Sequence, residues 1–463
     1  MTLISSISGI RGTIGGKTGT GLTPDDIVRY TAAYGTWTLL NEKSSRGKVI
    51  VGRDGRISGA IISNIVCSTL LALGIDVIDL GLSTTPTVEM AVTGECAIGG
   101  IIITASHNPK QWNALKFLNN KGEFISNEEG NLILDLAKKG NYNYADNEHL
   151  GIYKKSLHYF KYHIDRILKL PIIDIEAIKK ADFKIVVDAV NSTGGLAVPL
   201  LLRSLGVSQI IEINCKPDGK FTHNPEPLPE NLSSLSSEVR IKNADMGIAI
   251  DPDVDRLALV CEDGEFFGEE YTLVAVADYV LQNTPGNTVS NLSSTRALED
   301  ITVKHGQNYA ASAVGEVNVV AKMKETNAVI GGEGNGGIIY PPLHYGRDAL
   351  VGIALFLSLL AKSGKDMSVL RNKYPNYFIS KNKIDLSEVT KINTQDILDK
   401  ITEMYKKYPI NTIDGVRIDF DRDWVHLRKS NTETVIRIYA ESNTKTMSDN
   451  LAKKIISDIK RLI

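Results

Sequence analysis

The chain has 463 residues, and its hydrophobic fraction of 43% and charged fraction of 23% are ordinary for a globular protein. At typical domain size this length predicts about three or four domains. A formal net charge of −2, with no dense tract of lysine and arginine, argues against nucleic acid or an acidic membrane as partner.

The four cysteines lie far apart and form no C-x-x-C pair, which predicts reduced side chains in a cytoplasmic protein. The first residues carry neither a basic segment nor a sustained apolar run, so we expect no signal peptide. The longest apolar stretch, residues 349–361, is too short to span a bilayer and predicts a buried helix.

Three stretches share one pattern: a short β-branched strand, a polar turn and a helix rich in small residues. They cover residues 48–73, 184–205 and 288–305, and a glycine follows each helix, as the C′ position prefers. This repetition predicts three related α/β domains with mixed or parallel sheets. Residues 53–59, in the first stretch, are interpreted as structural: a turn and a helix start with paired charges.

The C-terminal part of the chain differs from these three units. An amphipathic helix is predicted over residues 394–408, with Thr394 as its N-cap. Three strands and a closing helix are predicted over residues 414–420, 424–428, 434–440 and 448–463. This pattern is typical of an α+β unit.

The loop at residues 104–109 follows an apolar, β-branched run over residues 97–103, which predicts a buried strand that ends at the loop. Pro109 fixes a turn, because proline keeps the residue before it out of the α region. Ser106, at a strand end beside a histidine and backbone N–H groups, is placed to carry a phosphoryl group. The alternative is that this serine only caps a helix.

Three aspartates, Asp251, Asp253 and Asp255, alternate along a short segment between two apolar runs. Alternating side chains of an extended segment project to one side, and three carboxylates so close would repel one another unless a cation lay between them. Hard oxygen ligands suit Mg²⁺, which takes further oxygens from phosphate. The alternative, a solvated acidic turn, is disfavoured by the flanking apolar runs, and the spacing does not fit an EF-hand.

Residues 331–337 form a glycine-rich segment that contains Glu333 and Asn335. Flexible glycines bring backbone close to a ligand, while a carboxylate and an amide can bind its hydroxyl groups. A plain hairpin turn is the alternative for such a segment.

Residues 428–434 lie between two predicted strands and combine a guanidinium, an ammonium, hydroxyls and an amide. Together with the N–H groups of a turn, this set suits the dianion of a phosphate monoester. A polar hairpin loop without a ligand is the alternative.

These four motifs extend over nearly the whole chain and resemble those of the α-D-phosphohexomutase family, which includes phosphoglucomutases, phosphomannomutases and phosphoglucosamine mutases. The resemblance implies an α/β fold of four domains around a central cleft: three similar mixed-sheet α/β domains and a smaller α+β C-terminal domain. The implied ranges are 1–150 with the phosphoserine loop, 151–256 with the metal-binding loop, 257–372 with the sugar-binding loop and 373–463 with the phosphate-binding loop.

The resemblance also assigns roles to individual residues. The implied catalytic residues are Ser106, Arg11, Lys116 and His107, although a capping or turn role is equally open for His107. The implied metal ligands are Ser106, Asp251, Asp253 and Asp255, with Arg256 in support. The implied sugar-binding residues are Glu333 and Asn335, and the implied phosphate-binding residues are Arg428, Ser430, Asn431 and Thr432.

Some positions depart from the family pattern. Asn335 replaces a common serine and Gly337 a common histidine in the sugar loop, Ala114 replaces a glycine before Lys116, and Lys429 and Thr434 replace prolines. The positions of the loops follow from the resemblance, but the preferred sugar does not follow from the loops.

The family mechanism implies that phosphorylated Ser106 donates its phosphoryl group to O1 or O6 of a sugar monophosphate. The resulting bisphosphosugar, which is the intermediate and activator, reorients and returns its other phosphate to the serine. One Mg²⁺ per chain neutralises charge on the transferring group. The C-terminal domain is expected to close about residues 372–376, and any of Arg11, Lys116 and His107 could move the proton.

Residues 331–337 and 313–319 look closest to archaeal-type phosphoglucosamine mutases. The expected reaction therefore interconverts glucosamine 6-phosphate and glucosamine 1-phosphate, which leads to UDP-N-acetylglucosamine and peptidoglycan precursors. Phosphomannomutase/phosphoglucomutase activity is the alternative substrate choice. A non-catalytic sugar-phosphate-binding protein and a metal-dependent phosphatase are alternatives of other classes. The expected partners are hexose or hexosamine phosphates, and the chain is expected to be a monomer or homodimer.

Overall fold

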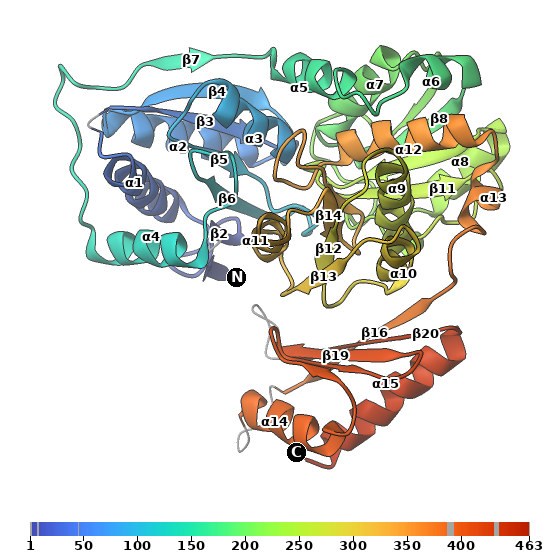
Figure 1. The fold of residues 1–463 in the computed structure, drawn as a ribbon. Helices are drawn as coiled ribbons and strands as arrows, with labels where there is room; N and C mark the ends of the chain where they lie inside the picture. Colours follow the sequence, from blue (N-terminus) through green and yellow to red (C-terminus); the bar gives the residue numbers. More distant parts are fainter. Residues whose placement is uncertain (1, 7–8, 45, 387–392, 430–434, 463) are drawn as a thin grey trace.

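The computed structural model describes residues 2–6, 9–44, 46–386, 393–429 and 435–462 (Figure 1). Its strands form four sheets, of seven, four, four and five strands in chain order. The first three sheets mix parallel and antiparallel pairs, and the fourth is antiparallel throughout. The predicted fold class, three mixed α/β domains and an α+β C-terminal domain, is therefore confirmed.

The first sheet has the strand order β1-β2-β6-β5-β3-β4-β7. Its strands are β1 (Leu3–Ser6), β2 (Gly9–Thr13), β3 (Lys48–Arg53), β4 (Asp76–Leu82), β5 (Gly99–Ile103), β6 (Trp112–Leu118) and β7 (Tyr153–Lys155). Its helices are α1 (Pro24–Asn41), α2 (Gly59–Ala72), α3 (Thr85–Gly94) and α4 (Asn127–Lys139). The predicted buried strand before Ser106 is β5, whose five residues are all buried.

The second sheet has the order β11-β10-β8-β9. Its strands are β8 (Lys184–Asp188), β9 (Gln209–Ile213), β10 (Met246–Ile250) and β11 (Leu257–Cys261). The accompanying helices are α5 (Tyr159–Leu168), α6 (Ile175–Ala181), α7 (Gly194–Ser204), the short 3₁₀ turn η1 (Pro229–Asn231) and α8 (Ser233–Lys242). The apolar runs on both sides of the aspartates are thus β10 and β11, an antiparallel pair.

The third sheet has the order β13-β12-β14-β15. Its strands are β12 (Thr288–Asn291), β13 (Tyr309–Ser312), β14 (Ile330–Glu333) and β15 (Gly337–Ile339). The helices of this part are α9 (Glu269–Asn283), α10 (Ala297–Lys304), α11 (Glu316–Thr326), α12 (Ala349–Ser363) and α13 (Met367–Arg371). The helix expected over residues 349–361 is α12, which is buried from its first residue to Leu360. None of the described helices is both long and apolar enough to cross a bilayer.

The C-terminal sheet has the order β16-β20-β19-β18-β17. Its elements are β16 (Phe378–Asp385), α14 (Thr394–Tyr405), β17 (Ile410–Asn411), β18 (Val416–Asp419), β19 (Trp424–Lys429), β20 (Val435–Ser442) and α15 (Lys445–Lys460). Thr394 as N-cap of α14 is wrong: the cap is Asn393, whose side chain accepts a hydrogen bond from Gln395 N.

The hydrophobic cores do not follow the four sheets one by one. One large core spans the second and third domains, and each of these two domains also has a smaller cluster of its own. The first domain has two separate clusters and the C-terminal domain has one. The ranges of the domains stay predictions. Strand pairing favours two later boundaries, because β7 is hydrogen-bonded to β4 and β11 to β10.

Candidate active site

One buried arginine, Arg56, holds the loop that carries Ser106. Its terminal nitrogens donate to four carbonyl oxygens, those of Ser106 at 2.5 Å, Asn108 at 2.6 Å, Pro109 at 2.8 Å and Trp112 at 2.9 Å. The serine has a φ of 48°, a conformation that costs a non-glycine residue about 1–3 kcal/mol and persists only where its surroundings impose it. Residues 53–59 therefore position the serine loop, which the local sequence pattern does not reveal.

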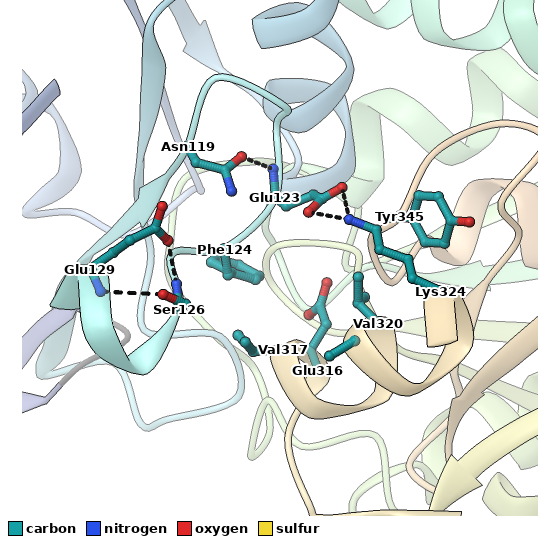
Figure 2. A pocket seen from close by; sticks show the side chains of 11 residues that line it. Asn119, Glu123, Phe124, Ser126, Glu129, Glu316, Val317, Val320, Lys324 and Tyr345 are labelled. Atoms are coloured by element: carbon teal, nitrogen blue, oxygen red, sulfur yellow. Dashed lines mark hydrogen bonds and ion pairs between the residues drawn. The ribbon is translucent and has the colours of Figure 1, made fainter. Parts of the chain in front are cut away.

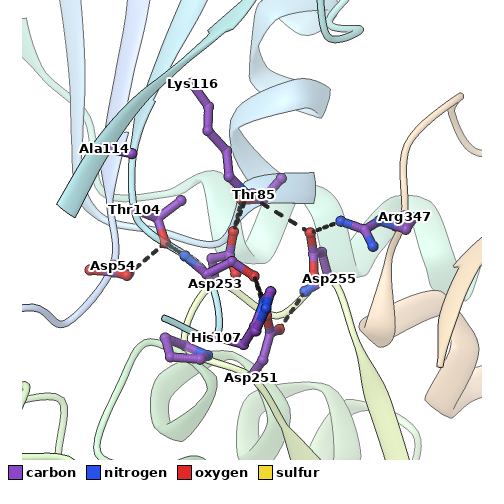
Figure 3. Close-up of polar contacts among 12 residues, drawn as sticks. Asp54, Thr85, Thr104, His107, Ala114, Lys116, Asp251, Asp253, Asp255 and Arg347 are labelled. Carbon is purple, nitrogen blue, oxygen red and sulfur yellow. Dashed lines mark hydrogen bonds and ion pairs between the residues drawn. The ribbon is translucent and has the colours of Figure 1, made fainter. Parts of the chain in front are cut away.

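The hydroxyl of Ser106 lies against the acidic segment between β10 and β11. Its Oγ donates to Asp251 Oδ2 at 2.7 Å. The extended conformation expected for this segment is wrong: it is a turn, in which Val254 has a φ of 64°. The turn still brings the three carboxylates together, with ligand atoms all within 4.8 Å of one another and each aspartate fully buried (Figure 3).

The residues of this turn fit a bound cation. Among the described residues, Asp253 Oδ1 and Asp255 Oδ1 have no hydrogen-bond partner, although both atoms are buried. Burial and repulsion by Asp255 and Asp253 raise the pKa of Asp251 well above its usual range. Three buried carboxylates with orphaned oxygens are a set that a hard divalent cation completes.

Two side chains of the first domain contact Asp253. Lys116, on β6, places its Nζ 2.8 Å from Asp253 Oδ2 and 3.9 Å from Asp255 Oδ2. Burial acts to lower the pKa of Lys116, but the two aspartates outweigh it and raise the pKa overall. Thr85, the first residue of α3, donates from its hydroxyl to Asp253 Oδ2 at 2.7 Å and from its backbone N–H to Asp253 O at 2.9 Å. The aspartate turn is therefore joined to two elements of the first domain.

Arg347 connects the aspartate turn to the sugar loop, and sequence reasoning missed it. Its guanidinium donates to Asp255 Oδ2 at 2.6 Å, Glu333 Oε2 at 2.8 Å and Glu316 Oε2 at 3.0 Å. The signal lies in Gly337, where the family commonly has histidine. A Cβ at that glycine would lie 2.4 Å from Arg347 Cδ, so the absent side chain leaves the space that the arginine fills.

The two predicted sugar-binding residues differ in their availability. Glu333, at the end of β14, accepts hydrogen bonds at Oε1 from Asn291 Nδ2 and Gly315 N, besides its contact with Arg347. Asn335 uses its Oδ1 to accept from Gly337 N, which stabilises the turn before β15. The side-chain amide nitrogen of Asn335 is the group that this turn contact leaves for a ligand.

Three further predicted residues belong to the serine loop, the aspartate turn and β2. His107 Nδ1 lies 3.4 Å from Ser106 Oγ, and burial together with the charge of Arg256 lowers the pKa of this histidine well below its usual value. Arg256 donates its backbone N–H to Asp251 Oδ1 at 3.2 Å. Arg11 pairs with Ala114 in the β2–β6 register, which places it on the same face as Lys116, two residues further along β6.

The predicted phosphate-binding residues are only partly described. Arg428, near the end of β19, places its Nε 3.2 Å from Asp414 Oδ2. Ser430, Asn431 and Thr432 lie outside the described residues. The fold places Arg428 on a different domain from Ser106, as the sequence predicts.

A cavity of about 190 Å³ lies between the first and third domains, beside Glu316 (Figure 2). The segment after β6 forms one wall and α11 the other, and Lys324 Nζ bridges them through both carboxylate oxygens of Glu123, each at 2.6 Å. Glu316 faces this cavity and also accepts a hydrogen bond from Arg347, so the cavity lies close to the aspartate turn that Arg347 contacts.

The site so far defines a class: a phosphoryl-transfer centre in which a serine of one α/β domain meets an acidic cation site of the next. Family models for phosphoglucomutase/phosphomannomutase match in order: alpha/beta/alpha domain I at residues 4–143, domain II at 161–264, domain III at 268–377 and the C-terminal domain at 381–457. The chain therefore belongs to the phosphoglucomutase/phosphomannomutase family of α-D-phosphohexomutases.

Individual relatives agree with this assignment. A phosphoglucomutase/phosphomannomutase of Thermococcus kodakarensis is 37% identical and covers 92% of each chain. A probable phosphoglucosamine mutase of Methanopyrus kandleri is 33% identical and covers 98% of this chain and 97% of its own. A solved structure of a phosphoglucomutase/phosphomannomutase family protein from Burkholderia thailandensis is 26% identical, covers 99% and 97% of the two chains and has a TM-score of 0.83. The protein is an enzyme of the phosphohexomutase class.

Proposed function

We propose that this enzyme interconverts glucosamine 6-phosphate and glucosamine 1-phosphate through a phosphoserine at Ser106. The observation that carries the proposal is the 2.7 Å hydrogen bond from Ser106 Oγ to Asp251 Oδ2 inside the buried acidic turn. The names of relatives support the amino sugar: probable phosphoglucosamine mutases of Methanopyrus kandleri and Pyrococcus horikoshii are 33% and 34% identical. The 37% identical relative named for glucose and mannose phosphates keeps those sugars as the second candidate.

The proposed reaction exchanges one P–O bond for another in each of two steps. In the first step the bond between phosphorus and Ser106 Oγ breaks as a bond forms between phosphorus and O1 or O6 of the sugar. The proton of that sugar hydroxyl moves to a base, and the product of this step is a bisphosphosugar. In the second step the bond between the other phosphorus and its sugar oxygen breaks as a bond forms to Ser106 Oγ. That sugar oxygen takes up a proton, and the isomeric sugar monophosphate is released. Lys116 and Arg11 stabilise the charge of the group in transfer, and one of Arg11, Lys116 and His107 moves the proton.

Mg²⁺ is the proposed cation, held by Asp251, Asp253 and Asp255 together with an oxygen of Ser106 or its phosphate. When bound, it supplies positive charge that neutralises the transferring group. Glu333 and Asn335 are proposed to contact sugar hydroxyls. Arg428, Ser430, Asn431 and Thr432 are proposed to hold the phosphate that does not react. The proposed setting is the cytoplasm, in the supply of UDP-N-acetylglucosamine, with the chain as monomer or homodimer.

A substrate panel tests the proposal. The purified protein would be assayed with Mg²⁺, a trace of bisphosphosugar and the 6-phosphates of glucosamine, glucose and mannose, with products followed by phosphorus NMR. We expect the highest kcat/KM with glucosamine 6-phosphate. Highest kcat/KM with glucose or mannose would establish the second candidate, release of phosphate without isomer would indicate a phosphatase, and binding without turnover a sugar-phosphate-binding protein.

The cation has its own test. Removing one charged ligand weakens a hard-cation site, so Asp253→Asn should lower activity and recover part of it at high Mg²⁺ concentration. If a chelator does not change the activity of the wild type, the assignment of a catalytic cation to the acidic turn is wrong.

A further inference from the structure

Two histidines and an aspartate meet where the first three domains join, outside the residues assigned above. His163 lies on α5, His344 in the segment after β15, and Asp348 at the N-terminus of α12. His163 Nε2 lies 2.9 Å and His344 Nε2 3.3 Å from the same atom, Asp348 Oδ2. His163 and Asp348 have fully buried side chains, and that of His344 is 11% exposed.

Both histidines direct their Nε2 atoms at the same carboxylate oxygen, Asp348 Oδ2, which lies within hydrogen-bond distance of each. Asp348 commits its other oxygen, Oδ1, to the backbone N–H groups of Leu350 and Val351 at the start of α12. Tetrahedral zinc holds histidine nitrogens at about 2.0–2.1 Å and carboxylate oxygens at about 2.0–2.2 Å, so its ligand atoms lie about 3.4 Å apart. The observed separations of 2.9 and 3.3 Å approach this spacing, and all three candidate ligand atoms lie within 4.8 Å of one another.

Both histidines also have a partner at the ring nitrogen that faces away from Asp348. Thr87 Oγ1 lies 3.0 Å from His163 Nδ1, and Glu89 Oε2 lies 3.2 Å from His344 Nδ1. Such partners fix the tautomer of zinc-binding histidines and raise their basicity. Glu89 is 2% exposed, so its carboxylate is held beside His344 with little screening by solvent.

We propose that His163, His344 and Asp348 bind a divalent cation of the zinc class, with Glu89 and Thr87 orienting the two imidazoles. Nitrogen-rich ligands favour zinc at this site, whereas the oxygen-only aspartate turn favours magnesium. Zinc here would fasten α5, the segment after β15 and α12 to one another, and Thr87 and Glu89 would tie α3 to the two imidazoles. Because Thr85 and Arg347 contact the catalytic turn from the same two segments, the cation would also brace the catalytic centre.

The alternative occupant is a proton, which would make His344 an imidazolium between Glu89 and Asp348. Metal analysis of the full-length protein, made without a histidine tag and dialysed against excess Mg²⁺, separates the two. We expect one tightly bound zinc per chain, and visible d–d absorption typical of tetrahedral coordination after replacement by cobalt. A protein that contains no zinc, takes up none and shows no such cobalt spectrum would overturn the proposal in favour of the proton.

Variants locate the ion. His163→Ala and His344→Ala should each lose the zinc, while Glu89→Gln should weaken zinc affinity about 10- to 100-fold and keep the ion bound at high zinc. His149→Ala, which changes an exposed histidine paired with Asp146, is the matched control and should retain the metal. Asp253→Asn should retain it too, so the result is independent of the catalytic assignment. Zinc that persists in both His163→Ala and His344→Ala would place it elsewhere.

The Glu89→Gln result keeps the test decisive if an alanine variant does not fold, because it changes no ligand. Wild-type affinity in Glu89→Gln would contradict the orienting role. Thermal unfolding adds a second readout: zinc should raise the Tm of the wild type and of His149→Ala, because binding to the folded state alone stabilises it. The same addition should leave the Tm of His163→Ala unchanged.

Discussion

Ser106 is the residue on which the proposed chemistry depends. Its hydroxyl makes one strong contact, to Asp251, and its backbone is held by Arg56. Ser106→Ala should therefore abolish turnover and leave the fold intact, with a stability cost of about 1–3 kcal/mol from the acceptor that loses its donor. Intact-mass analysis should find phosphoprotein in the wild type, mapped to this serine. Turnover at the wild-type rate in the alanine variant would rule out the phosphoserine relay.

Arg347 holds three buried carboxylates, so its loss should be felt in stability as well as in activity. Arg347→Met removes the charge and leaves Asp255, Glu333 and Glu316 without their partner, which should cost about 3–5 kcal/mol. Urea unfolding measures this cost. Arg203→Met, which breaks an exposed pair with Glu212, is the control and should change stability by less than about 1 kcal/mol. Equal effects of the two substitutions would refute the interpretation.

At the scale of elements, the loop after β5 depends on the planar guanidinium of Arg56, which donates to four carbonyl oxygens of the loop and of β6. Lysine has three donors on one atom and cannot reach four carbonyls arranged around a planar guanidinium. Arg56→Lys should therefore lower kcat by at least about tenfold with a smaller change in KM, since this residue is buried and acts through the backbone of the serine loop. Steady-state kinetics and the fraction of phosphorylated Ser106 provide the check. An unaltered kcat would show that the serine loop keeps its conformation without the guanidinium of Arg56.

The elements also show what the sequence could and could not predict. Strong local patterns, such as the apolar run of β5 or the continuous apolar stretch of α12, identify elements correctly because burial dictates their composition. The convergence of the three aspartates was predicted for the wrong reason, since a turn with a strained Val254 brings them together. The roles of Arg347 and Arg56 at the site were not predicted, because their partners lie in distant segments of the chain. The hydrophobic periodicity of a short segment contains no information about such long-range contacts.

At the scale of the whole molecule, the attachment of the C-terminal domain should respond to acid. His426 lies between the Ser293 hydroxyl, 2.8 Å from its Nδ1, and the carbonyl of Asp414, 2.6 Å from its Nε2. Burial, with a smaller effect of Arg417 and Arg428, lowers the pKa of His426 to about 4. The unfolded chain then binds a proton between pH 6.5 and about 4 that the folded protein does not, so stability falls as the pH falls through this window.

The size of that effect is at most about 3 kcal/mol for one histidine. Thermal unfolding between pH 4 and 7 should show a flatter profile in His426→Gln than in the wild type, because glutamine keeps hydrogen-bonding groups but does not titrate in this range. The exposed His149→Gln is the control and should follow the wild type. Parallel profiles for wild type and His426→Gln would exclude this histidine as the acid-sensitive group.

The segment that leads into the C-terminal domain is fastened just before β16. Tyr271, on α9, donates its hydroxyl to the carbonyl of Pro375 at 2.7 Å and accepts from Tyr377 N at 2.8 Å. The chain passes from α13 to the last sheet only here (Figure 1), so residues 372–376, the expected hinge, are partly clamped.

The C-terminal domain is held to the third domain both by this covalent tether and by non-covalent contacts. The tether gives the C-terminal domain a high effective concentration beside the third domain. Polar contacts between the two include those of His426 with Ser293, Arg417 with Leu292 and Glu441 with Arg296 N. One cut at the tether would turn this intramolecular docking into association between two separate polypeptides. The activity of the nicked enzyme would then depend on dilution, although no catalytic group had been removed.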